Sequence, residues 1–372
     1  MEQGSGGILS TVAEGHGGPA LAYTRQQERT SSAPPASSRG PASSRFGAAA
    51  RQRWMRWLRP IFALVGILAL VLLVRDAGIT VLRDILTAAA PWLPLVVGLE
   101  FARVGTDALA TYWTLGDRAR HLPTAVLMRA QLVATAVSGI APAGRAAGEA
   151  VKAAMIAPWA GSPAATASAA TAQAVTLLAA GIISIPCAVA SWQIAGPRAT
   201  ITMALIVHSV VLIVIGTLMR YGMRARRVCA LLARMSRRSG DATAAFQATV
   251  RSNHLLPGWP IAAQLVGRVL QIVQYAILAY AVGVPLTLPR ALVAQGMNMV
   301  GLAVGVLVPG QVGVSEGAFA LGADALGTSL AKAISIALLA HVIQVAFIPL
   351  GAFLPIIWKV RPPTGEPAEQ AS

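Results

Sequence analysis

Forty-five consecutive residues of this 372-residue chain, from Ala153 to Pro197, carry no charged side chain. Three further stretches of 21 to 26 residues also lack Lys, Arg, Asp and Glu, namely 199–219, 269–289 and 333–358. About 20 apolar residues suffice for a helix to cross the hydrocarbon core of a bilayer. Hydrophobic residues make up 55% of the chain and charged residues only 12%, too few for the polar surface of a soluble protein of this length. The sequence therefore predicts a polytopic membrane protein.

Helices are the expected spanning elements, because runs of about ten residues with alternating hydrophobicity, which mark a membrane barrel, are absent. We expect an all-α polytopic fold with about six transmembrane helices and two re-entrant helical hairpins. The predicted spans are 57–74, 91–113, 163–190, 199–219, 258–282 and 332–358. The predicted hairpins are 123–158 and 290–330.

Each predicted hairpin contains the same break, a proline followed seven residues later by a glutamate with glycines between them. The first reads Pro142-Ala-Gly-Arg-Ala-Ala-Gly-Glu149, and the second reads Pro309-Gly-Gln-Val-Gly-Val-Ser-Glu316. Helix-breaking backbone inside a membrane is tolerated only where it packs within protein or lines a water-filled cavity, and an unpaired carboxylate there is costly. The repetition indicates a duplicated membrane site.

Two arginine-rich segments set the expected topology. Eight arginines among residues 25–59 outnumber three acidic residues in the first 59, and eight arginines in the loop 220–251 face one acidic residue. Such loops stay cytoplasmic. Five crossings before the second loop would place it outside, so 123–158 is expected to enter from the cytoplasm and turn back. The hairpin at 290–330 then enters from the opposite side, which is the arrangement of an inverted repeat.

The chain is expected to have three parts. Residues 1–53 are rich in Gly, Ser, Ala and Pro, which predicts a disordered cytoplasmic tail. Residues 54–358 form the predicted transmembrane domain, with a cytoplasmic basic loop at 220–255, and 359–372 form a second cytoplasmic tail. We expect a multi-pass protein of the cell inner (cytoplasmic) membrane with both termini in the cytoplasm.

The basic loop has two interpretations. Leu231, Leu232 and Met235 lie among its arginines, as expected of a helix that lies on an anionic leaflet. Alternatively, the arginines only orient the protein in the membrane. Nucleic-acid binding explains the net charge of +16 poorly, because the basic residues flank spans and form no domain with interleaved aromatic residues.

The broken segments resemble a known family. Ala147-Gly148-Glu149-x-x-Lys152 and the run from Pro309 to Glu316, followed by Gly-Ala, are similar to the flippase-like membrane domain of lysylphosphatidylglycerol synthases and their stand-alone relatives. The resemblance spans roughly 55–358, and the spacing from proline to glutamate is closest to a hopanoid-associated branch. It implies a protein that moves lipids between leaflets or assists their export.

This chain departs from the family pattern in two places. Ala147 and Lys152 replace the Gly or Arg that relatives usually carry, and uncharged residues 171–176 replace a Glu-Arg-x-x-Asp signature common in relatives. We expect no counterpart of the family's soluble aminoacyl-transferase domain, since 14 residues follow Trp358. We therefore expect no aminoacylation of phosphatidylglycerol by this chain alone.

Each break should begin a new half-helix, whose free N–H groups and dipole favour an anion such as a lipid phosphate. The substrate-binding residues predicted at the two breaks, together with a cation in 258–282, are Gly144, Arg145, Gly148, Glu149, Lys152, Pro309, Gly310, Gln311, Gly313, Ser315, Glu316 and Arg268. The glycines should let the ligand approach, and Arg145 and Lys152 should contact phosphate oxygens. The two glutamates, as first-turn carboxylates, should gate the site or carry a proton.

Several of these residues have a second interpretation. Glu149 and Lys152, three apart on a helix, are also placed to neutralise each other. Arg268 is expected either to pair with Glu316 or to face phosphate. The further polar residues predicted to line the site are Arg103, Asp107, Asn298, His341 and Gln344. Of these, Arg103 and Asp107 are expected to form a self-contained pair. His341, like His208, is expected to be a satisfied core histidine rather than a proton relay.

The sequence favours a transporter over an enzyme. It contains no metal-ligand spacing and no phosphate-binding GxxxxGK[ST] loop, so we expect no cofactor and no metal. Cys187 and Cys229 are expected to be reduced thiols. We expect a flippase-like protein that translocates or helps export an anionic, polyprenyl-linked or hopanoid-type lipid. The alternatives are a non-transporting scaffold for a lipid- or glycan-modifying enzyme, and a lipid head-group enzyme. Membrane lipids are the expected partners, nucleic acid is not, and no oligomeric state is predicted.

Overall fold

The structure is a computed structural model that describes residues 79–141, 144–225, 240–252, 255–308 and 313–358, with the single residues 71, 75 and 311. The described elements are all helical, which confirms the predicted all-α fold class. Five long apolar helical segments in this part of the chain can cross a membrane. The predicted first span 57–74 lies largely outside the described residues. So do both predicted tails, Leu231, Leu232, Met235, Cys229, and the break residues Pro142, Pro309 and Gly310.

The helices follow one another with short connections. In chain order they are α2 (Ile79–Ala89), η1 (Ala90–Trp92), α3 (Leu93–Leu115), η2 (Gly116–His121), α4 (Thr124–Ile140), α5 (Gly144–Ala160), α6 (Ser162–Ala195), α7 (Thr200–Arg224), α9 (Gly240–Ser252), α10 (Gly258–Ala281), α11 (Leu288–Val304), η3 (Gly305–Leu307), α12 (Val314–Leu321), α13 (Ala323–Leu326) and α14 (Leu330–Ile357). The ends of α3, α6, α7, α10 and α14 differ from the predicted spans by at most five residues.

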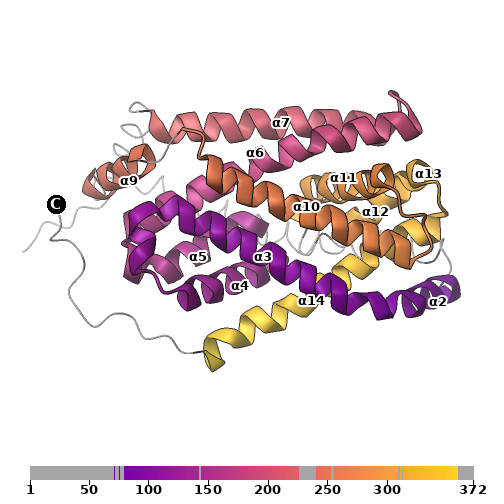
Figure 1. The fold of residues 1–372 in the computed structure, drawn as a ribbon, viewed down its shortest axis with the longest axis horizontal. Helices are drawn as coiled ribbons and strands as arrows, with labels where there is room; N and C mark the ends of the chain where they lie inside the picture. The colour runs from indigo at the N-terminus through magenta and orange to yellow at the C-terminus, as the bar shows by residue number, and fades with distance from the viewer. Residues whose placement is uncertain are drawn as a thin grey trace, which may run out of the picture. The chain divides into compact units, whose positions relative to one another are not determined.

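The described helices belong to one compact unit, residues 55–372. Within it α3, α6, α7, α10 and α14 run between the same two ends (Figure 1). One end holds η2, α9 and the last turn of α14. The other holds α2, α13 and the connection from α6 to α7. The long helices therefore cross the unit, and the chain alternates between its ends.

Two helix pairs turn back before they cross. Hairpin 1 consists of α4 and α5 and starts and finishes at the end that holds α9, whereas hairpin 2 consists of α11 and α12 and starts and finishes at the end that holds α13 (Figure 1). Both hairpins stop near the middle of the unit. The two segments predicted to be re-entrant are thus the two that reverse.

Proline and glycine explain where several helices begin and end. Proline occupies the first turn of α3, α6 and α11, where its missing N–H costs no helical hydrogen bond. Gly196 connects α6 to α7 with φ of 87°, and Gly283 follows α10 with φ of 79°. These left-handed conformations favour glycine, so the sharp reversals fall where the sequence supplies it.

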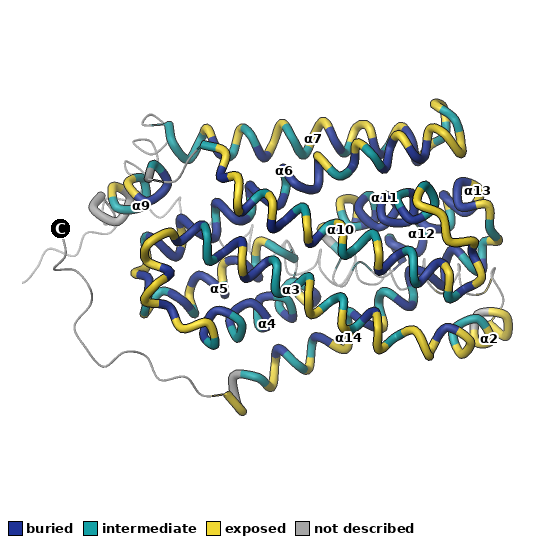
Figure 2. The backbone as a smooth tube through the Cα atoms, in the orientation of Figure 1, coloured by how far each residue is buried: buried dark blue, intermediate teal, exposed yellow. Residues whose placement is uncertain are grey.

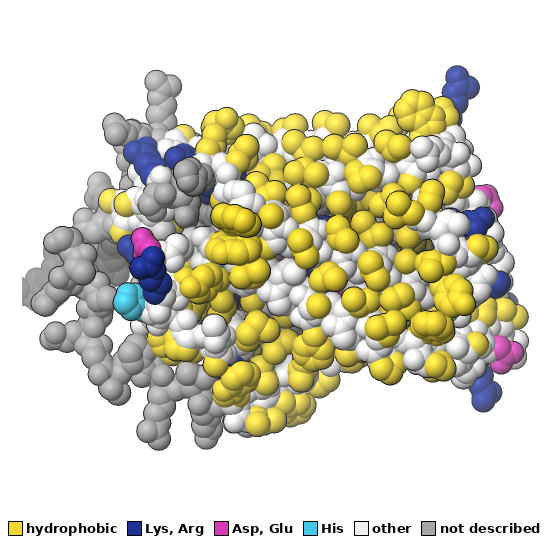
Figure 3. Space-filling view, in the orientation of Figure 1, with side chains coloured by type: hydrophobic (Ala, Val, Ile, Leu, Met, Phe, Trp, Pro, Cys, Tyr) yellow, Lys and Arg dark blue, Asp and Glu magenta, His cyan; other side chains and the backbone are white. Residues whose placement is uncertain are grey.

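The outer surface is apolar along the middle of the long helices. Hydrophobic side chains cover most of the visible face between its two ends, and the charged side chains visible there gather at those ends (Figure 3). On α7 the outward residues Val207, Val210, Val214 and Leu218 are 48% to 63% exposed, and Figure 2 shows the exposed turns. Soluble monomers rarely expose apolar surface of this extent, whereas a membrane protein needs it.

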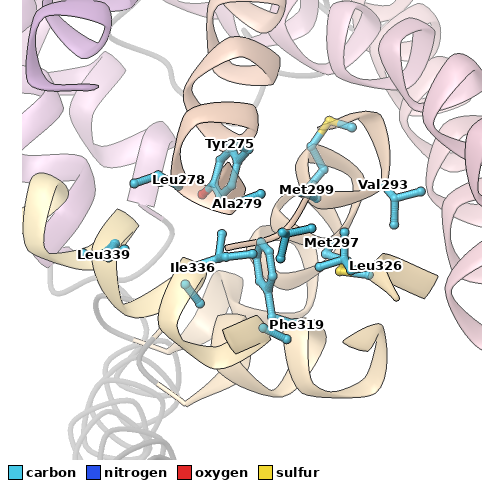
Figure 4. Close-up of a cluster of buried hydrophobic side chains, with 14 of the residues drawn as sticks. Tyr275, Leu278, Ala279, Val293, Met297, Met299, Phe319, Leu326, Ile336 and Leu339 are labelled. Atoms are coloured by element: carbon cyan, nitrogen blue, oxygen red, sulfur yellow. The ribbon is translucent and has the colours of Figure 1, made fainter. Parts of the chain in front are cut away.

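Hairpin 2 is held by a large apolar core. Met297 and Met299 of α11 and Phe319 of α12 are buried against α10 and α14 (Figure 4). The rings of Tyr275 and Phe319 stack with centroids 5.8 Å apart. A second apolar cluster, which includes Ile156 of α5, packs hairpin 1 against α3 and α6. Each hairpin thus has a separate apolar anchor.

The position of the hairpins can be tested with single cysteines in a variant without Cys187 and Cys229. Asp117→Cys and Ala244→Cys should react with an impermeant maleimide from one side of the membrane, and Ala195→Cys should react from the other. The reason is that the first two positions share an end of the unit in Figure 1 and the third lies at the opposite end. Labelling in sealed vesicles of known orientation checks this.

Two further cysteines test the hairpins themselves. Pro158→Cys, after hairpin 1, should label from the same side as Ala244→Cys, and Leu286→Cys, before hairpin 2, from the side of Ala195→Cys. Label at positions 158 and 244 from opposite sides would contradict the reversal of hairpin 1. A variant that keeps the fully buried Cys187 as its only cysteine serves as the unreactive control.

Candidate functional site

A cavity of about 640 Å³ lies between the tips of the two hairpins. Its lining includes Ala141 and Gly144 from the break in hairpin 1, and Val308 and Gln311 from the break in hairpin 2. The remaining lining residues come from both hairpins and from α3, α6, α7, α10 and α14. A volume of this size is typical of sites that hold small molecules. The two breaks, far apart in the sequence, therefore lie at one cavity.

Backbone conformation explains how the new half-helices begin. Gly144 starts α5 with φ of 37°, and Gly313 precedes α12 with φ of 83°. The N–H of Gly313 donates a hydrogen bond of 2.8 Å to Oε2 of Glu316. A carboxylate in the first turn satisfies a free N–H group and is stabilised by the helix dipole. Gly313 and Glu316 thus act together as the cap of α12, and Glu316 is a first-turn carboxylate as predicted.

Six charged side chains on α3 and α5 form what we call the ion network: Glu100, Arg103, Asp107, Arg145, Glu149 and Lys152. Arg103 contacts Glu100 at 2.5 Å and Asp107 at 3.0 Å. Arg145 reaches Asp107 from α5, with 2.8 Å between Nη2 and Oδ1. Arg103 and Asp107 therefore form the expected ion pair, but the pair is not self-contained. The sequence could not reveal that Arg145, 38 residues away, shares Asp107.

Lys152 lies behind the cavity wall, not in the cavity. Its side chain is 1% exposed, and Nζ lies 2.8 Å from Oε2 of Glu149. Nζ also donates to Thr111 Oγ1 at 2.8 Å and to Gln131 Oε1 at 3.0 Å. All three ammonium protons have partners, so the predicted contact of Lys152 with a ligand phosphate is wrong. The alternative, a neutralising pair with Glu149, is confirmed.

Glu149 also differs from its prediction as a first-turn carboxylate. Helix α5 begins at Gly144, so Glu149 is its sixth residue and lies in the second turn. Its side chain lines the cavity at one edge and is 5% exposed. Its charge is stabilised by Lys152 and, at 4.0 Å, by Arg145, rather than by a helix end.

At the other side of the cavity Glu316 contacts a histidine. Nδ1 of His341 lies 2.6 Å from Oε1 of Glu316, which is fully buried. Arg268 does not pair with Glu316, which corrects the first of its two expected roles. Its Nη1 instead donates to Gln271 Oε1 at 2.7 Å, and the side chain lines the cavity. The prediction that Arg268 faces a phosphate stays open.

The histidines have polar partners, as expected of satisfied core residues. Nδ1 of His208 lies 2.9 Å from the hydroxyl of Ser184. His208 and His341 both line the cavity, so both can contact a molecule bound there.

Gly148 has a different role from the one predicted. A Cβ atom at this position would lie 2.5 Å from the carbonyl oxygen of Ala134 on α4, and still closer to the Ser138 hydroxyl. Gly148 therefore lets α4 and α5 pack closely and is not part of the cavity lining. Gly144 does line the cavity, in agreement with its predicted place beside a ligand.

The structure thus brings most of the predicted residues to one place. The predicted residues that line the cavity are Gly144, Arg145, Glu149, Gln311, Ser315, Arg268, Arg103, Asp107, Asn298, His341 and Gln344. The predicted residues that lie behind it are Gly148, Lys152, Gly313 and Glu316. Pro309 and Gly310 lie outside the described residues.

Sequence reasoning missed the polar face of α10. Gln264 donates to Asp107 Oδ1 at 2.7 Å, and Gln274 donates to Glu100 Oε2 at 3.1 Å. Gln264, Arg268 and Gln271 are four and three residues apart, so they share one helix face. That spacing of polar residues within an apolar segment indicates a polar helix face from the sequence alone. The pairing of Glu100 with Arg103 was also predictable from the sequence, because Glu100 precedes Arg103 by three residues.

The described residues contain no group of His, Cys, Asp or Glu side chains arranged to hold a metal ion. The polar groups of the cavity are instead ion pairs, amides and hydroxyls. Such a lining can bind a charged or hydrogen-bonding group.

The comparison with known families agrees with this architecture. The family described as "Lysylphosphatidylglycerol synthase TM region" matches residues 58–351. The chain belongs to this family. The match covers both hairpins and nearly all of α14, so the cavity lies within the region that defines this lysylphosphatidylglycerol synthase TM-region protein. No curated protein and no solved structure matches the chain.

Gly148→Ala should destabilise this protein, because the new methyl group must displace the backbone of α4. Overpacking of this kind typically costs about 1–3 kcal/mol. The matched control is Gly98→Ala on α3, where an added Cβ meets nothing within 4 Å and helix propensity improves. Thermal unfolding in detergent should show a lower midpoint for Gly148→Ala alone. Equal midpoints would show that the contact with α4 is unimportant.

Lys152→Met should destabilise the protein strongly, because Glu149 would remain buried without its cation. Removing one partner of a buried ion pair typically costs about 3–5 kcal/mol. The double variant Lys152→Met with Glu149→Gln should recover part of the loss. Arg120→Met, which breaks an exposed pair with Asp117, should leave the unfolding midpoint unchanged. A double variant no more stable than Lys152→Met would contradict the pairing.

Proposed function

We propose that this lysylphosphatidylglycerol synthase TM-region protein moves a membrane lipid between leaflets. The observation that carries the proposal is one cavity, lined by charged and amide side chains, at the tips of two hairpins that enter the unit from opposite ends. A lipid head group needs a polar path through hydrocarbon, and this cavity offers polar partners at that depth.

The lining of the cavity also suits the rest of a lipid. Val211 and Ile215 of α7 line the cavity and are 43% and 46% exposed, and Val306 at the tip of hairpin 2 lines it and is 50% exposed. These residues belong to both the cavity wall and the outer surface. The cavity therefore has an apolar border at the membrane-facing surface, where acyl chains can remain in hydrocarbon while the head group enters.

Opposed hairpins supply a way to alternate access. In transporters built from inverted repeats, binding sites lie near the bilayer midplane where broken helices meet, and one repeat moves against the other. We infer the same inverted arrangement here, with hairpin 1 at the cytoplasmic side because the described ends of the arginine-rich segment, the last turn of α7 and helix α9, lie at the same end. Movement of either hairpin tip would open the cavity toward its own side. We propose the inner membrane as its location, with both termini in the cytoplasm.

Lipid movement can be measured with purified protein in liposomes that contain a fluorescent lipid in both leaflets. An impermeant quencher removes only the outer-leaflet signal unless the protein exchanges lipid between leaflets. We expect faster and more complete quenching with the protein than in protein-free liposomes. Mass spectrometry of the lipids should show no chemical change, and an altered head group would instead indicate an enzyme.

Glu316→Gln should slow this exchange about tenfold, since a hydrogen bond to a charged group contributes about 1.5–3 kcal/mol. The Glu316 carboxylate holds His341 beside the cavity and stabilises the start of α12. The substitution removes its charge and so weakens both interactions. Asp117→Asn, an exposed change far from the cavity lining, should exchange lipid at the wild-type rate. Lipid exchange by Glu316→Gln at the wild-type rate would contradict the proposed role of Glu316. A scaffold protein would exchange no lipid in any variant, including the wild type.

A further inference from the structure

Arg268 lies outside the ion pairs that surround the cavity. Each carboxylate of the ion network has a cation within 4.0 Å, so its three carboxylates and three cations neutralise one another. Glu316 is satisfied separately by His341 and Gly313. Arg268 is an additional cation in the lining, and among the residues that the structure describes no carboxylate lies within ion-pair distance of it.

Arg268 retains most of its hydrogen-bonding capacity. A guanidinium has five N–H donors, and the contact recorded for Arg268 uses Nη1 to bind the neutral amide of Gln271. A second cation, Arg145, lines the same cavity. Arg145 Nε is buried and has no hydrogen-bond partner, although Nη2 of the same group binds Asp107. Two guanidinium groups that repel each other thus have donors to spare in one cavity.

We propose that Arg268, assisted by Arg145, binds the phosphate of an anionic lipid head group. This inference rests on the proposed function and specifies its substrate class. Phosphate oxygens match the forked donors of arginine, and an anion between two guanidinium groups relieves their repulsion. An arginine without a counter-ion is energetically costly at membrane depth. Binding of an anion beside Arg268 would lower that cost.

The partners of the four carboxylates around the cavity also favour a head group with net negative charge. Arg268 has no carboxylate within ion-pair distance, whereas Glu100, Asp107, Glu149 and Glu316 all have cationic or N–H partners. A zwitterionic head group, or one with an added ammonium as in lysylphosphatidylglycerol, would bring a cation without a partner. An anionic phospholipid such as phosphatidylglycerol would not. The membrane-facing apolar border at Ile215 and Val306 favours a lipid over free phosphate.

The binding experiment is independent of transport. Purified protein in detergent is heated with short-chain phosphatidylglycerol, short-chain phosphatidylcholine or inorganic phosphate, and the shift of the unfolding midpoint is recorded. We expect a larger shift with phosphatidylglycerol than with the other two probes. Arg268→Gln should weaken apparent affinity for phosphatidylglycerol about tenfold, as loss of charge-assisted hydrogen bonds implies. Arg268→Lys should recover part of it.

Arg198→Gln is the matched control, because Arg198 is exposed between α6 and α7 and does not line the cavity. It should bind phosphatidylglycerol like the wild type. Equal affinity of wild type and Arg268→Gln for phosphatidylglycerol would overturn the inference, as would an equal shift with phosphatidylcholine. An equal shift with inorganic phosphate would assign the site to free phosphate instead. If Arg268→Gln does not fold, competition between the two lipids on the wild type decides the same question.

Transport then separates the two proposals. In liposomes, labelled phosphatidylglycerol should exchange faster than labelled phosphatidylcholine, and Arg268→Gln should abolish this preference. Exchange without a head-group preference would retain the proposed function and refute the role of Arg268. Selective, Arg268-dependent binding without exchange of either lipid would refute transport and retain the anionic site.

Discussion

The structure depends on the requirement that a charge buried inside a membrane has a partner. Asp107 meets this requirement with donors from three helices: Arg103 on its own helix α3, Arg145 on α5 and Gln264 on α10. These bonds tie the tip of hairpin 1 to two long helices. A buried charge deprived of its partner costs several kcal/mol, so this network constrains where the hairpin can stop. The cavity exists beside the tip because the polar groups that end the hairpin cannot pack against hydrocarbon.

The two hairpins carry the same sequence motif but are stabilised differently. Helix α5 begins five residues before Glu149, whereas α12 begins two residues before Glu316. Glu149 therefore lies in the second turn and pairs with Lys152, while Glu316 reaches back to the N–H of Gly313. Hairpin 1 relies on ion pairs, and hairpin 2 on a cap and a stacked aromatic core. The same spacing of proline and glutamate is therefore stabilised by different interactions in the two hairpins.

Membership of the lysylphosphatidylglycerol synthase TM-region family places the chain among membrane proteins related to lipids. The cavity has two features that suit a lipid: arginine N–H donors without partners, and an apolar border on the outer surface. The residues that make it polar divide into two kinds. The ion network is internally neutral and supports the architecture, whereas Arg268 has hydrogen-bonding capacity left over. The ion network thus supports the architecture, and the proposed recognition of a phosphate rests on Arg268 together with the unpartnered Nε donor of Arg145.

The sequence by itself determined the membrane class, the five described long helices, and the two places where helices break, because each follows from local hydrophobicity, proline or glycine. It also identified most residues that line the cavity, since polar groups within apolar segments are rare. Only the tertiary structure decided their partners. Arg145 reaches Asp107, His341 reaches Glu316, and Gly148 faces Ala134 instead of a ligand. Such contacts join residues far apart in the chain or on facing helices, and their geometry is set by how the helices pack rather than by spacing along the sequence.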